Sequence, residues 1–76
     1  MMNDEQKANR IHELSKELSF SLRRLLKIFG IYEANFARIR EGECNVKDRT
    51  KQKLDKILNY LESAFSVKSQ LLGTVY

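Results

Sequence analysis

The chain contains no proline, no tryptophan and only three glycines, at positions 30, 42 and 73, in 76 residues. Proline and glycine are the residues that most disfavour the interior of a helix, so little in this chain interrupts helices. Leu, Lys, Glu, Arg and Ala, which favour helices, are abundant. The composition therefore predicts an all-α protein in which the glycines mark the ends of helices.

Cysteine and histidine are equally scarce, because Cys44 and His12 are the only ones. One cysteine cannot form an internal disulfide, and one cysteine with one histidine cannot complete a four-ligand zinc site. We therefore expect no metal and no cofactor. A domain of this size has a small core, and a partner subunit is the remaining means of adding stability, so we expect a homodimer.

Long apolar runs are also missing. No run of about 18 apolar residues exists to form a transmembrane helix, and residues 1–10 lack the apolar centre of a signal peptide. A single unpaired cysteine fits a reducing compartment, so we expect a cytoplasmic protein with no membrane partner. The sequence also has no nucleophile–base pairing, no glycine-rich phosphate loop and no paired carboxylates in a plausible cleft, so we expect no enzyme activity.

The apolar spacing predicts a compact bundle of four or five helices. We expect helices over residues 3–18, 22–29 and 33–40, with Ser21 as the N-cap of the second and with Gly30 and Gly42 ending the second and third. A further helix begins between residues 45 and 48 and continues toward residue 72, either unbroken or as two helices. We divide the chain into residues 1–62, the body, and residues 63–76, a C-terminal helical extension. The expected core residues are Ala8, Ile11, Leu14, Leu18, Leu25, Phe29, Ile31, Phe36, Ile39, Leu54, Ile57, Leu58 and Leu61.

Positive charge is concentrated in one segment. Residues 23–56 contain ten basic and five acidic residues, a net +5, although the whole chain carries only +4. This distribution suits a polyanionic partner, and the alternative is an ordinary solvated helix surface.

Two short helices joined at Gly30 and closed by Gly42 have the layout of a helix-turn-helix. With apolar residues at Leu25, Phe29, Ile31, Phe36 and Ile39, residues 8–61 resemble the lambda-repressor-like (Xre/Cro) helix-turn-helix family, and NVKDRTKQKLDKIL has some likeness to the LacI headpiece. The resemblance implies that the helix over 33–40 enters the major groove of DNA. It gives base-reading roles to Tyr32, Glu33, Ala34, Asn35, Ala37 and Arg38, and phosphate contacts to Arg23, Arg24, Arg40, Lys47, Arg49 and Lys51. Arg38 is the best candidate for reading guanine.

The apolar stripe of the last helix is longer than a small core needs. We therefore expect dimer contacts near the C-terminus, from Leu61, Phe65, Leu71 and Leu72. The expected function is a sequence-specific DNA-binding transcriptional regulator of the kind found as small phage or mobile-element repressors, with two recognition helices about 34 Å apart on an inverted repeat. The alternative is a protein-interaction module of the same fold, which binds a repressor or host protein. Glu33 and Glu41 favour that alternative slightly, and the positive segment opposes it.

Overall fold

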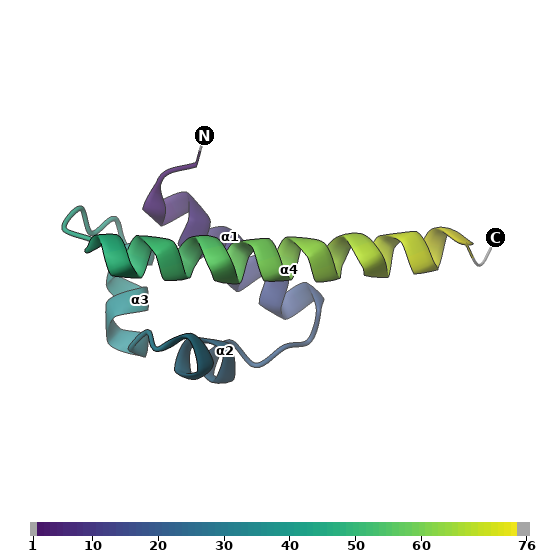
Figure 1. Ribbon diagram of the computed structural model, residues 1–76, viewed down its shortest axis with the longest axis horizontal. Helices are drawn as coiled ribbons and strands as arrows, with labels where there is room; N and C mark the ends of the chain where they lie inside the picture. The colour runs from purple at the N-terminus through teal and green to yellow at the C-terminus, as the bar shows by residue number, and fades with distance from the viewer. Residues whose placement is uncertain (1, 75–76) are drawn as a thin grey trace.

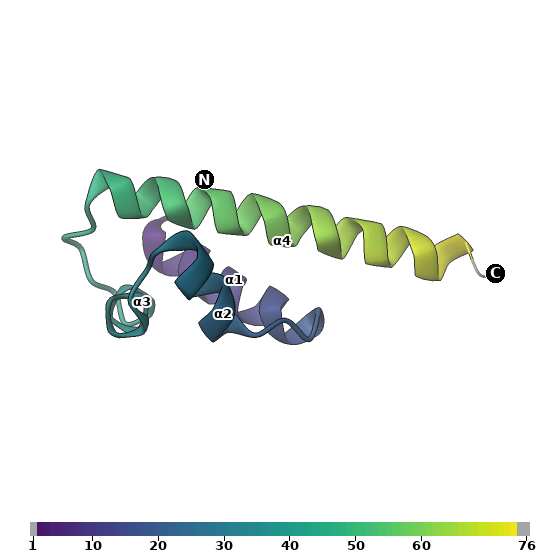
Figure 2. The same cartoon turned by 60° about the horizontal axis from the view of Figure 1, so that its bottom comes forward.

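A computed structural model of the protein describes residues 2–74, with side chains described for residues 2–71, as four α-helices. They are α1 (Asp4–Glu17), α2 (Leu22–Phe29), α3 (Glu33–Arg40) and α4 (Asp48–Thr74). The predicted all-α class is confirmed, and the segment after residue 48 is one unbroken helix. The three short helices gather along one half of α4, and the other half projects beyond them (Figures 1 and 2).

The helix ends follow from local chemistry. Asn3 Oδ1 accepts the Gln6 N–H at 2.8 Å while Gln6 Oε1 accepts the Asn3 N–H at 3.0 Å, which is a capping box at the start of α1. Ser21 Oγ accepts the Arg24 N–H at the start of α2. Gly30 ends α2 in the left-handed region, with a φ of 78°, where a side chain would be disfavoured. The bounds predicted for the second and third helices are confirmed.

The core lies between α1 and the first half of α4, with α2 and α3 packed against α1. A fully buried leucine or isoleucine contributes about 1.5–3 kcal/mol through removal of its surface from water. Leu18 and Phe29, which we expected in the core, are only partly buried at its edge, and Leu26 is buried in addition. The buried apolar residues are Ala8, Ile11, Leu14, Leu25, Leu26, Ile31, Phe36, Ile39, Leu54, Ile57, Leu58 and Leu61.

Polar contacts fix α1 along α4. Lys7 pairs with Asp55 at 2.6 Å. One helical turn further along, the Arg10 guanidinium pairs with Glu62 at 2.8 Å and lies 5.9 Å from the centre of the Phe65 ring. At the end of α1, Lys68 Nζ donates to the Glu17 carbonyl at 2.8 Å. Because exposed ion pairs contribute little individually, these contacts serve mainly to set the register of the two helices.

The 27 residues of α4 span about 40 Å at 1.5 Å per residue, which accounts for most of the 46 Å length of the molecule. The helix crosses the expected boundary between residues 62 and 63 without a break. None of the described helices is long and apolar enough to cross a membrane.

Candidate nucleic-acid interface

The turn between α2 and α3 is held from two sides. On the inner side, the buried Ile31 donates its N–H to the Leu26 carbonyl at 2.8 Å. On the α4 side, Lys53 Nζ donates to the Gly30 carbonyl at 3.0 Å. The orientation of α3 is therefore fixed by both the core and α4. Sequence reasoning did not predict the Lys53 contact, because it depends on how α4 crosses the end of α2.

The eight residues of α3 divide into an inner and an outer face. Phe36 and Ile39 are buried. On the outer face, Arg38 is exposed, and the small residue Ala34 lies one turn before it. The six residues that sequence reasoning placed in base reading all lie at the surface: Tyr32, Glu33, Ala34, Asn35, Ala37 and Arg38.

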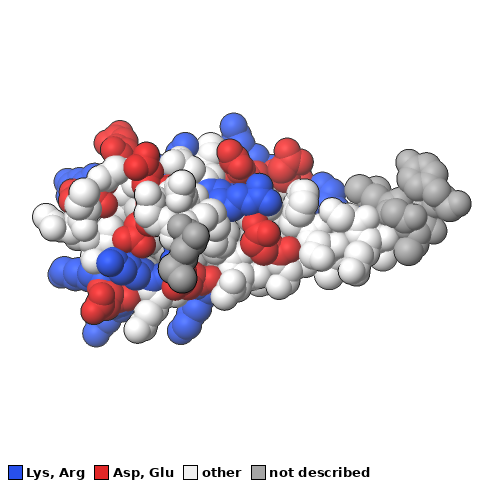
Figure 3. Space-filling view, turned by 90° about the horizontal axis from the view of Figure 1, so that it is seen from above, with Lys and Arg blue, Asp and Glu red and all other residues white. Residues whose placement is uncertain are grey.

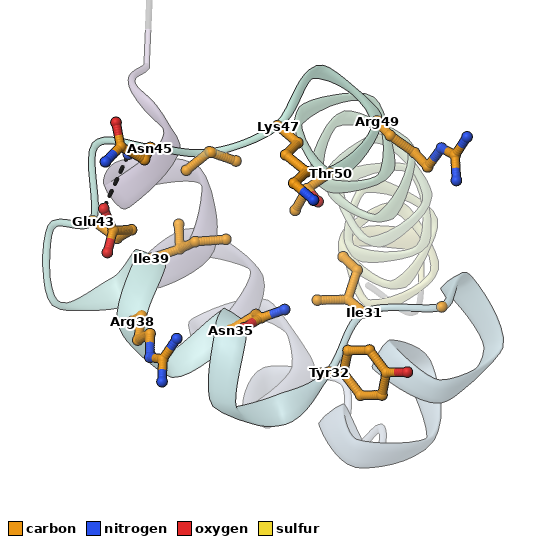
Figure 4. A pocket seen from close by; sticks show the side chains of 12 residues that line it. Ile31, Tyr32, Asn35, Arg38, Ile39, Glu43, Asn45, Lys47, Arg49 and Thr50 are labelled. Carbon is orange, nitrogen blue, oxygen red and sulfur yellow. Dashed lines mark hydrogen bonds between the residues drawn. The ribbon is translucent and has the colours of Figure 1, made fainter.

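An open groove runs between α3, the loop of residues 43–47 and the first turn of α4, which we call the α3–α4 groove. Tyr32, Asn35 and Arg38 border it on the α3 side, and Figure 4 shows it from the end at which α4 begins. The lining also includes Lys47 and Arg49, so three predicted DNA-contacting cations border the groove, with Arg38 and Arg49 on its opposite sides (Figure 4). The full lining is Gly30, Ile31, Tyr32, Asn35, Arg38, Ile39, Glu43, Asn45, Val46, Lys47, Arg49 and Thr50.

The three cations of the α3–α4 groove have no carboxylate partner. Among the residues that the structure describes, the ion pairs involve Lys7, Arg10, Arg23 and Lys51, and none involves Arg38, Lys47 or Arg49. The pairing of Arg38 with Glu41, three residues further along the helix, is therefore absent. Charged groups that are solvated and unpaired in the free protein are available to an incoming anion.

One carboxylate, that of Glu43, also lines the α3–α4 groove. Its Oε1 accepts the Asn45 N–H at 3.0 Å, so the side chain is turned onto its own loop (Figure 4). The groove consequently carries three positive charges against one negative charge.

On the opposite flank of α3, Arg23 Nε pairs with Glu33 at 2.9 Å. Both side chains are exposed, at 85% and 58% of their surface, so we expect the pair to contribute only about 0.2–1 kcal/mol. The contact joins a residue expected at a phosphate with one expected at a base. It also neutralises one of the two acids that favoured a protein-binding role.

Two other expected phosphate contacts lie away from the α3–α4 groove. Arg40 is half-buried, and its Nε donates to Asn9 Oδ1 of α1 at 3.2 Å. Lys51 Nζ lies 3.9 Å from the Asp4 carboxylate at the start of α1. Both side chains reach α1 because α1 crosses α3 and α4, a crossing that residue spacing does not reveal. Arg24 is exposed and does not line the groove.

The expected dimer contacts need one correction. Leu61 is completely buried in the core, so it cannot lie at a surface contact. Phe65 is partly buried against the core, and Leu71 is 63% exposed. The side chain of Leu72 lies outside the described residues. Sequence reasoning missed Tyr60 and Val67, which are 51% and 54% exposed, although their spacing from Leu71 was visible in the sequence.

Comparison of the chain with protein-family models, curated proteins and solved structures found no match. Within residues 2–71, no three His, Cys, Asp or Glu side chains are grouped so that they could hold a metal ion.

Proposed function

We propose that the protein is a sequence-specific DNA-binding transcriptional regulator that docks the outer face of α3 in the major groove. The observation that carries the proposal is the α3–α4 groove, where Arg38, Lys47 and Arg49 are exposed and form no ion pair among the described residues. The concentration of positive charge in residues 23–56 supports the same partner. The helix-turn-helix layout of α2 and α3, and its resemblance to the lambda-repressor-like family, complete the support.

We assign base contacts to side chains of α3 and phosphate contacts to side chains at the start of α4. Arg38 pairs through two N–H groups with O6 and N7 of guanine, which distinguishes that base from the others. Lys47 and Arg49, at the start of α4, contact phosphates and fix the position of α3 without reading sequence. Asn35 lies on α3 between Arg38 and Tyr32 and offers an amide that can bond adenine (Figure 4). In the bound state we expect Arg23 to exchange Glu33 for a phosphate, because the exposed pair is weak.

The test is a fluorescence-anisotropy titration of the full chain against DNA from upstream of its own gene, with random DNA as competitor and at two salt concentrations. We expect binding to the upstream DNA that survives the competitor. Arg38→Ala should weaken that binding by about 1–3 kcal/mol and bring it close to the affinity for random DNA. Lys16→Ala is the matched control, because it also removes one exposed positive charge but does not line the groove.

Equal losses in Arg38→Ala and Lys16→Ala would contradict the assigned base contact and leave only general electrostatic attraction. The absence of binding at both salt concentrations would contradict the DNA-binding function itself. In that case the protein-interaction alternative would stand, and co-purification with a repressor or host protein would be the next experiment.

A further inference from the structure

The second half of α4 carries an exposed apolar stripe. Tyr60, Val67 and Leu71 are 51%, 54% and 63% exposed, and Ala64 between them is half-buried. Their spacing of four, three and four residues places them along one line of the helix, as in the seam of a coiled coil. We call these four residues the α4 stripe.

The α4 stripe lies apart from the charges of its segment. Residues 60–71 contain only two charged side chains, Glu62 and Lys68. Both are held by α1, Glu62 through Arg10 and Lys68 through the Glu17 carbonyl. On the face drawn in Figure 3, Lys, Arg, Asp and Glu gather over the body, and the described part of the projecting end is mostly uncharged. A surface of this kind favours an apolar partner over a charged one.

We propose that the α4 stripe binds the α4 stripe of a second copy of this chain, with the two helices antiparallel. The stripe is symmetric about a point between residues 65 and 66. Tyr60 lies five residues before residue 65, and Leu71 lies five residues after residue 66. Ala64 and Val67 lie one residue before and one residue after the same two positions. An antiparallel pair on a two-fold axis therefore sets Tyr60 against Leu71 of the second copy and Ala64 against Val67. A two-fold interface requires such self-complementarity.

The position of α2 favours the antiparallel over the parallel arrangement. Lys53 lies seven residues before Tyr60 on the same line, and its contact with the Gly30 carbonyl places the end of α2 there. A parallel second helix would meet the end of α2 at Lys53, whereas in the antiparallel pair α4 of the second copy ends at Thr74, opposite residue 57, and does not reach Lys53. The Phe20 ring stacks on Tyr60, with the ring centres 6.2 Å apart, and borders the stripe in either arrangement.

Charge gives the same preference. Glu62 and Lys68 cancel each other, so the entire net charge of +4 lies in residues 1–59. A parallel pair places two such bodies side by side, where like charges repel. An antiparallel pair places them at opposite ends.

The arrangement has a consequence that rests on the proposed function. The α3–α4 groove opens at the end where α4 begins, and Figure 4 looks along α4 into it. In the antiparallel pair the two grooves face outward at opposite ends, about 50 Å apart along the helices at 1.5 Å per residue. Such a dimer bridges two DNA segments. It does not read one inverted repeat, because that requires both α3 surfaces on the same side of the dimer.

The surface is tested by sedimentation equilibrium of the full chain. A contact of about three helical turns per copy is smaller than a standard interface of about 1,600 Å², so the series should extend from about 1 to about 500 µM protein. We expect dimer formation by the unchanged chain and by Ser69→Glu, which lies on the opposite side of the same turn, and monomer for Val67→Glu. A monomeric unchanged chain, or equal behaviour of the two variants, would overturn the proposed surface. Circular dichroism of both variants shows whether the fold is retained.

The orientation is tested by spin labels in a chain carrying Cys44→Ser and Gln52→Cys, which leaves one exposed cysteine near the start of α4. The antiparallel pair should separate the two labelled positions by about 40 Å along the helices. The parallel pair should hold them within about 20 Å, since packed helices lie about 8–10 Å apart. A short distance would overturn the antiparallel arrangement. Neither experiment contains DNA, so a dimer that binds no DNA would contradict the proposed function and leave this interface standing.

Discussion

The two halves of α4 belong to one helix but lie in different surroundings. From Asp48 to Leu61, four apolar side chains are buried against α1, and the first turn borders the α3–α4 groove. From Glu62 to Lys68 only a few contacts with α1 continue, and beyond Lys68 the helix projects to Thr74. Helix propensity alone cannot hold such a projection firmly, because helices in proteins are stabilised mainly by packing of an apolar face.

The comparison indicates that the halves have different tasks. The first half completes the core and presents cations, whereas the second half exposes apolar surface. An exposed apolar stripe is costly for solubility unless a partner covers it. Each difference between the halves gives a measurable prediction.

The largest expected effect separates the halves by stability. Leu61→Ala should lower the free energy of unfolding by about 2–5 kcal/mol, because Leu61 is completely buried and its removal leaves a cavity. Val67→Ala should change it by less than about 0.5 kcal/mol in solutions dilute enough for the proposed dimer to dissociate. Urea unfolding followed by circular dichroism measures both. A similar loss in Val67→Ala would mean that the second half packs within its own chain.

Most of the fold could be predicted because apolar period and caps act locally. Ser21 and Gly30 set the bounds of α2, and the three-residue spacing of Phe36 and Ile39 is enough to identify the inner face of α3. The unbroken course of α4 could not be predicted in the same way. Its residues after Leu61 favour a helix, but a single helix and two helices satisfy the same apolar spacing.

Less of the candidate interface could be predicted, because it depends on how helices cross. The cations over residues 23–56 form one group in sequence, but α1 takes Arg40 and Lys51 away from the α3–α4 groove. The Arg23–Glu33 pair likewise joins residues ten positions apart that only the turn at Gly30 brings together. Leu61 and Val67 are apolar residues of the same helix but lie about 120° apart around it at 3.6 residues per turn, and the place where α1 crosses α4 decides which of the two faces is covered.

The second prediction concerns the turn that fixes α3 against the first half of α4. Gly30→Ala should cost about 1–2 kcal/mol of stability, because φ is 78° and a left-handed conformation is disfavoured for alanine. The added Cβ would also lie 3.2 Å from Lys53 Nζ. Gly30→Asn should cost less, since asparagine tolerates this conformation better. Thermal unfolding of the two variants gives the order of their stabilities. Equal losses of stability would show that crowding of the new side chain against Lys53 outweighs the cost of the left-handed backbone conformation.

A smaller effect distinguishes cations that line the α3–α4 groove from those that do not. Lys47→Ala should reduce the slope of log affinity against log salt by about 0.9, as expected for one lost phosphate contact. Lys51→Ala should reduce it less, because Lys51 lies near Asp4 and outside the groove. Titrations of random DNA over a salt series measure both slopes. A larger change for Lys51→Ala would move the DNA-binding surface toward the start of α1.

The smallest expected effect lies in α1, which links the body to the projecting half. Burial, followed by the positive charges of Arg40 and Lys16, lowers the pKa of His12, and Glu13 opposes this only partly. The unfolded chain therefore binds a proton at this position more readily than the folded protein. The contribution of His12 to stability is complete above the usual histidine pKa of about 6.5, and it falls as the pH drops through that value toward the lower pKa of the folded protein. The free energy of unfolding, measured with urea at about pH 7.5 and about pH 5, should fall more for the unchanged chain than for His12→Gln. Glutamine at position 12 does not titrate between these two pH values. The carboxylates contribute equally to the pH dependence of stability in both chains. An identical loss of stability in the two chains would therefore show that folding does not disfavour the charged form of His12.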